Sequence, residues 1–218
     1  MALTLDGIWN LRNQVLFHED KADIQVATQQ IQFRLVEFSR IAAPNTYTTP
    51  PPSLLSWTPL PFNCIKINVD TAHSDHKASI VAVARNHDGV VIKVWAKSIP
   101  LCSPIQAEVT AILWAAQLAI SETWTNILIE GDAKLCFDAL SSTPSSANWS
   151  IMNIIDNIKS LTPSFVSCTF LWVRRICNIP AHTAAKLALT TVFSFCFSSN
   201  NLPPPLRLAC MADCPLVS

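Results

Sequence analysis

The chain has 218 residues, of which half are hydrophobic and 14% are charged, and its formal net charge is zero. This composition predicts a packed core, and it excludes a nucleic-acid binder that relies on overall positive charge, so any such contact must use local Lys and Arg. Three glycines against fifteen prolines also exclude Gly-rich phosphate loops.

The cysteines and the apolar segments indicate the compartment. The eight cysteines include no C-x-x-C pair, and most lie in apolar segments, where a free thiol packs as a small hydrophobe. We therefore expect no zinc site. Charged residues interrupt the start of the chain, and no uncharged apolar run reaches the roughly 18 residues of a membrane span. We expect an intracellular protein, in nucleus or cytoplasm, with no membrane partner.

Composition divides the chain into four parts. Residues 1–42 predict a helical segment, because apolar side chains recur there at helix-face spacing. Residues 43–61 form a Pro-rich linker, since repeated prolines favour extended backbone. Residues 62–195 form the main domain. Residues 196–218 contain no recognisable element, and we expect an irregular C-terminal tail.

The main domain begins with three predicted strands. Ile65, Ile67 and Val69 alternate with polar residues, which is the period of a strand, and this strand is expected to end at Asp70. Residues 78–85 and 90–95 form the next two strands, and Asp88-Gly89 between them is a strong hairpin signal. The three strands predict an antiparallel meander.

Helices and strands alternate after the meander. Ser103, Pro104 and Gln106 have the residue types of a capping box with proline at the first helical position, so a helix starts there and runs to about Ser121. Residues 126–130 are apolar enough for a strand that is covered on both faces, as in parallel pairing. The remaining expected elements are helices at 133–140 and 149–161, a strand at 166–173 and a final helix from 178 to about 193.

Three acids fall at comparable places in this order. Asp70 ends the first strand, Glu108 lies near the start of the first helix, and Asp132 follows the fourth strand. Taken singly, each has an ordinary explanation: a solvated strand end, a charge near a helix N-terminus, and a helix N-cap. If the first and fourth strands are parallel neighbours, however, the three carboxylates converge at one edge of the sheet. Such a cluster repels itself unless divalent cations occupy it.

The chain resembles the ribonuclease H type 1 family, and in particular the plant proteins derived from non-LTR retrotransposons. The resemblance covers roughly residues 57–193. The matching segments, in order, are Trp57, Pro61, Lys66-Ile67-Asn68-Val69-Asp70, Val83-Ala84-Arg85-Asn86-His87-Asp88-Gly89, Ala107-Glu108, Ile129-Glu130-Gly131-Asp132-Ala133, Trp172-Val173-Arg174-Arg175, Asn178 and Ala181-His182. It implies an α/β fold with a mixed five-stranded sheet, three antiparallel strands followed by parallel ones, flanked by helices.

The resemblance also implies an activity and a site. Asp70, Glu108 and Asp132 would bind two Mg²⁺ (or Mn²⁺) ions and hydrolyse the RNA strand of RNA–DNA hybrids. Recognition would use the sugar–phosphate backbone and 2′-hydroxyls. The residues expected to contact nucleic acid are Asn68, Lys134, Arg174, Arg175 and Asn178.

One departure weakens this expectation. The family has a fourth acid four residues after an Asn, and here that place is held by His182, which follows Asn178. A neutral imidazole adds no negative charge and suits Mg²⁺ poorly. The expected enzyme is therefore a weakened hybrid nuclease with His182 in its active site. The alternatives are a non-catalytic nucleic-acid-binding or scaffold domain and a decaying element fragment without a selected role.

Overall fold

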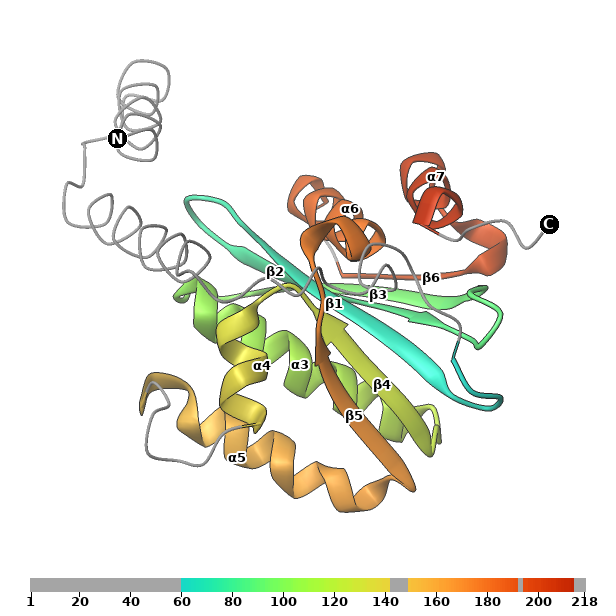
Figure 1. Ribbon diagram of the computed structural model, residues 1–218. Coiled ribbons are helices and arrows are strands. Elements are labelled where there is room, and N and C mark those ends of the chain that lie inside the picture. The colour runs from blue at the N-terminus through green and yellow to red at the C-terminus, as the bar shows by residue number, and fades with distance from the viewer. Residues whose placement is uncertain (1–59, 142–148, 192–193, 214–218) are drawn as a thin grey trace, which may run out of the picture. The chain divides into compact units, whose positions relative to one another are not determined.

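A computed structural model describes residues 60–141, 149–191 and 194–213, all of which belong to the compact unit formed by residues 51–218 (Figure 1). The helices expected in 1–42 and the linker up to residue 59 lie outside the described residues. Within the described ranges, no helix combines the length and the hydrophobicity needed to cross a bilayer.

The described domain is built on one mixed sheet with the strand order β5-β4-β1-β2-β3-β6. β1, β2 and β3 form the expected antiparallel meander, and β4 lies parallel to β1 and to β5. The strands are β1 (Ile65–His73), β2 (Ala78–Arg85), β3 (Val91–Ile99), β4 (Asn126–Gly131), β5 (Ser167–Trp172) and β6 (Phe195–Ser198). The mixed α/β architecture is confirmed, although the described sheet has six strands where five were expected.

Helices cover both faces of the sheet (Figure 1). One core lies between the sheet and α3, α4 and α5, and a second lies between the sheet and α6 and α7. The helices are α3 (Pro104–Ser121), α4 (Lys134–Ser141), α5 (Met152–Leu161), α6 (Ile179–Thr190) and α7 (Pro204–Asp213). Short 3₁₀ turns are η3 (Trp149–Ile151), η4 (Thr162–Ser164), η5 (Arg175–Cys177) and η6 (Ser199–Asn201).

Local signals in the sequence set several of these boundaries. Ser103 and Gln106 form the predicted capping box at the start of α3, with Pro104 at its first position. Gly89 in the turn between β2 and β3 has a φ of 80°, a conformation that favours glycine. Ile127 and Ile129, which share one face of β4, are at most 1% exposed, whereas on the opposite face Glu130 is buried and Leu128 is only partly buried.

The first strand does not end at Asp70, as the sequence suggested, but continues to His73. Its antiparallel pairing with β2 runs on to His73 and Ala78, whereas its parallel pairing with β4 stops at Asn68 and Glu130. Asp70 therefore lies within a strand, two residues beyond the last residue paired to β4. Backbone hydrogen bonding to β2 alone carries the strand past the acid.

The expectation of an irregular tail is wrong for residues 196–213. β6 pairs antiparallel with β3, and α7 packs on the second core, where Leu206 is fully buried. Pro204 and Pro205 occupy the first turn of α7, where a missing backbone N–H has no cost. The domain thus extends beyond the predicted end at 195.

Candidate active site

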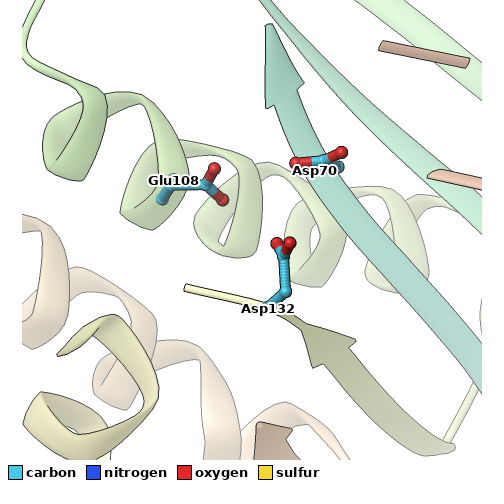
Figure 2. Close-up of side chains that lie close together, drawn as sticks. All are labelled: Asp70, Glu108 and Asp132. Atoms are coloured by element: carbon cyan, nitrogen blue, oxygen red, sulfur yellow. The ribbon is translucent and has the colours of Figure 1, made fainter. Parts of the chain in front are cut away.

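Three carboxylates from separate parts of the chain meet at one edge of the sheet (Figure 2). Asp70 lies on β1, Glu108 near the start of α3, and Asp132 directly after β4. Each offers an oxygen that lies within 4.8 Å of those offered by the other two. The convergence expected from the sequence is confirmed, because the parallel pairing of β1 and β4 brings Asp70 and Asp132 to the same edge.

Asp70 is almost fully buried, with a polar group at each carboxylate oxygen. The backbone N–H of Thr71 donates to Oδ1 at 2.8 Å, and Nδ1 of His182 lies 2.9 Å from Oδ2. Burial, and second the negative charge of Asp132, raise the pKa of Asp70 to about 6, although both hydrogen bonds favour the ionised form. The carboxylate is thus held in an environment that disfavours its own charge.

Glu108 is affected in the same way. Burial and then the charge of Asp70 raise the pKa of Glu108 well above its usual range. Two groups act in the opposite direction: the hydroxyl of Thr71, which donates to Oε1 at 2.7 Å, and the guanidinium of Arg175. Desolvated, mutually repelling carboxylate oxygens are the donor set that a hard divalent cation stabilises, so these residues fit such an ion.

Asp132 is placed by packing around its neighbours. A side chain at Gly131 would bring a Cβ to 3.0 Å from the Phe137 ring and 3.1 Å from Val69, so one of these side chains would have to shift by a few tenths of an ångström to admit it. The indole of Trp172 donates to the backbone carbonyl of Asp132 at 3.1 Å. The backbone of Asp132 is therefore fixed, and the Asp132 carboxylate points toward Asp70 and Glu108 (Figure 2).

His182 faces Asp70 from α6, and Arg175 lies against its ring. The Nη2 atom of Arg175 is 3.1 Å from both ring nitrogens of His182. Because a guanidinium only donates, the tautomer that satisfies both neighbours carries its proton on Nδ1, donates to Asp70 and accepts from Arg175 at Nε2. Asp70, His182 and Arg175 thus form a continuous polar chain at the edge of the acidic cluster.

A buried polar network lies beside the cluster, and the sequence did not suggest it. Glu130 accepts from Lys66 at 3.0 Å and from Asn68 at 3.2 Å. Asn68 also donates to Asn178 at 3.2 Å and accepts from Arg85 at 2.9 Å. All of these residues are at most 3% exposed. The network joins β1, β2 and β4 to the start of α6, which carries His182.

The five residues expected to contact nucleic acid fall into two groups. Asn68 and Asn178 are fully buried, and Asn178 donates to the backbone of Val69 at 2.8 Å. Neither amide reaches the surface in this structure, so a contact with nucleic acid is not supported for these two residues and stays a prediction from the sequence. Lys134, Arg174 and Arg175 are exposed. For Asn68 the only signal was that polar and apolar residues alternate along β1, which does not tell whether a helix covers the polar face.

The segment that contains the acidic cluster matches a known protein family. The model of a family described as reverse transcriptase-like matches residues 68–188, which contain the three acids and His182. The chain belongs to this family, and its domain has the fold seen in ribonucleases H. No curated protein is a significant sequence match to the chain.

Solved structures share the fold at low identity. RNase H1 of the halophilic archaeon Halobacterium salinarum NRC-1 is 21% identical, with a TM-score of 0.55 over 58% of this chain and 98% of that one. An N-terminal RNase H domain from Mycobacterium tuberculosis, solved as a fusion with maltose binding protein, is 19% identical, with a TM-score of 0.53 over 58% and 94%. LC11 RNase H1 in complex with an RNA/DNA hybrid is 16% identical, with a TM-score of 0.52 over 58% and 96%.

Proposed function

We propose that this protein is a divalent-cation-dependent nuclease that hydrolyses the RNA strand of RNA–DNA hybrids. The observation that carries the proposal is the meeting of Asp70, Glu108 and Asp132 within 4.8 Å, on a fold shared with ribonucleases H. Burial and mutual repulsion make the ionised cluster unfavourable by itself. A cation relieves this cost, which favours a binding role over three incidental surface acids.

The chain's own residues would divide the work as follows. Asp70, Glu108 and Asp132 would hold Mg²⁺ or Mn²⁺, which when bound supplies charge stabilisation at a scissile phosphate. Thr71 fixes the carboxylates of Asp70 and Glu108, and His182 holds Asp70 from the other side. The family resemblance suggests two ions at this site.

Substrate contact would come from the exposed cations beside the cluster. Lys134, Arg174 and Arg175 could neutralise phosphates, a sequence-independent and salt-sensitive mode of binding. One fold relative, LC11 RNase H1, has been solved with an RNA/DNA hybrid, which supports this class of substrate. An origin in a plant retroelement and a nuclear or cytoplasmic location remain predictions from the sequence.

A cleavage assay tests the proposal. The full chain is incubated with labelled RNA–DNA hybrid, double-stranded RNA or double-stranded DNA, each with Mg²⁺, Mn²⁺ or EDTA. We expect cleavage of the RNA in the hybrid alone, dependent on the cation and abolished in Asp70→Asn. Asp138→Asn is the matched control, because Asp138 is an exposed acid that pairs with Lys134 outside the cluster.

A second candidate, a nucleic-acid-binding domain without catalysis, is favoured by one observation. The imidazole of His182 contacts Asp70, so the side chain that borders the cluster there is not an anionic metal ligand. The same samples decide between the candidates. Hybrid that is bound but left intact with both Mg²⁺ and Mn²⁺ would overturn the nuclease and support the binding domain.

A further inference from the structure

We propose that the acidic cluster holds one divalent cation and not two, because His182 and Arg175 occupy the side of Asp70 that a second cation would need. This inference rests on the proposed function, since it concerns the ion content of the same site. Two-ion sites for phosphodiester hydrolysis share a carboxylate between ions a few ångströms apart and surround both with anionic ligands. The contacts of this cluster differ from that arrangement.

The first difference is at Asp70. One of its oxygens accepts from the Thr71 backbone, and the other faces Nδ1 of His182 at 2.9 Å. For Nδ1 to bind a cation, it must give up its contact with Asp70. A second ion on this side therefore gains no anionic ligand from position 182 and displaces an existing hydrogen bond.

The second difference is the fixed charge of Arg175. Its guanidinium carries a positive charge and lies 3.1 Å from the ring nitrogens of His182. It is also near enough to Glu108 to favour the ionised carboxylate. A cation placed beside His182 would be repelled by the positive charge of this guanidinium.

The charge balance agrees with a single ion. Three carboxylates and one guanidinium leave a net charge of −2, which one divalent cation neutralises. Replacing His182 by an acid and removing the charge of Arg175 would leave −4, which matches two divalent cations. The number of bound ions should therefore follow these two residues.

Ion counting tests the inference. Mn²⁺ binding to the full chain is measured by electron paramagnetic resonance, both free and with a hybrid whose RNA strand carries 2′-fluoro groups in place of the 2′-hydroxyls. Substrate phosphates can complete an ion's coordination, so the count with hybrid is the decisive one. We expect one Mn²⁺ per wild-type chain and two in the double variant Arg175→Ala/His182→Asp.

The remaining variants keep the outcomes distinct. Lys186→Ala removes an exposed positive charge from α6, the helix that carries His182, and should leave the number of bound Mn²⁺ ions at one. Arg175→Gln, with His182 unchanged, should give a weaker second ion, and it serves if the double variant does not fold, as judged by circular dichroism. Two ions of similar affinity in the wild type would overturn this inference alone. No bound ion, or a count unchanged by Asp70→Asn, would overturn the proposed metal site itself.

Discussion

The hydroxyl of Thr71 donates a 2.7 Å hydrogen bond to Oε1 of Glu108, which joins the strand that carries one acid to the helix that carries another. Successive strand residues point to opposite faces, so Asp70 faces α6 while Thr71 faces α3. A single residue thus contacts two members of the cluster, through its backbone N–H and its hydroxyl. Thr71 should therefore act as a positioning residue for cation binding.

Replacing Thr71 by Val removes the hydroxyl and keeps the shape of the side chain. A hydrogen bond to a charged group contributes about 1.5–3 kcal/mol, so we expect Mn²⁺ affinity to fall roughly tenfold or more. Thr71→Ser keeps the hydroxyl and should bind nearly as the wild type does. Isothermal titration calorimetry measures both affinities. Equal affinity in the Val and Ser variants would contradict the role of the hydroxyl.

The raised pKa of Asp70 predicts a pH-dependent stability of the cation-free protein. Its pKa is 3.8 in a model peptide and about 6 in the fold, so the native state binds more protons than the unfolded state between these values. The free energy of unfolding should therefore fall as pH rises through this window. Asp70→Asn removes the cost, which at about 1.4 kcal/mol per pKa unit is on the order of 1–3 kcal/mol.

Thermal melts in EDTA check this prediction. Asp70→Asn should melt several degrees above the wild type at pH 7.5, and the difference should shrink towards pH 4. Added Mg²⁺ should raise the melting temperature of the wild type and leave that of Asp70→Asn unchanged. A variant that is less stable than the wild type at pH 7.5 would show that burial and repulsion do not dominate at Asp70.

His182→Asp should raise hybrid cleavage above the wild-type rate. The change restores an anionic group beside Asp70 where the family has its fourth acid, and it replaces a side chain that suits Mg²⁺ poorly. We expect a gain of about tenfold in the rate at saturating Mn²⁺. His182→Asn is the control, since it changes the size of the side chain without adding charge. An equal gain in both variants would point to relief of the hydrogen bond to Asp70 instead.

Breaking the buried pair of Lys66 and Glu130 should destabilise the fold far more than breaking the exposed pair of Lys134 and Asp138. Lys66→Met removes the cationic partner of a buried carboxylate, that of Glu130, and leaves it only the hydrogen bond from Asn68, which costs about 3–5 kcal/mol. Lys134→Met breaks an exposed i,i+4 pair and should cost less than about 0.5 kcal/mol. Urea denaturation of both variants gives the two values, and similar losses would contradict the burial of the network.

The C-terminal helix should contribute to the stability of the domain. Leu206→Ala removes a fully buried side chain and should cost about 2–5 kcal/mol. Leu208→Ala, at a position that is 67% exposed two residues away on the same helix, should change stability by less than about 0.5 kcal/mol. Equal effects would mean that α7 does not pack on the second core in solution.

The sequence predicted most of the sheet and the three acids, because each depended on a local signal. The alternation of Ile67 and Val69, the Asp88-Gly89 turn and the Ser103 capping box are local in the chain, and the structure confirms the elements that they predict. The convergence of Asp70, Glu108 and Asp132 needed one further rule, that parallel neighbours end at the same edge.

What the sequence did not predict depends on contacts between distant segments. The extension of β1 to His73 comes from pairing with β2, and β6 forms only because β3 offers it an edge. The buried roles of Asn68 and Asn178 arise because α6 covers the polar face of β1. No pattern within one segment distinguishes such an amide from one that faces solvent.

Gly131 affects both the packing of the core and the position of Asp132 in the acidic cluster. A methyl group there would lie within 3.0–3.2 Å of neighbouring side-chain atoms, and the next residue carries the third acid. Any side chain at position 131 must first push aside the Phe137 ring or Val69, both within the main core. A substitution at this position therefore crowds the main core and the backbone that presents Asp132 at once, so core packing and the placement of the third acid depend on the same residue.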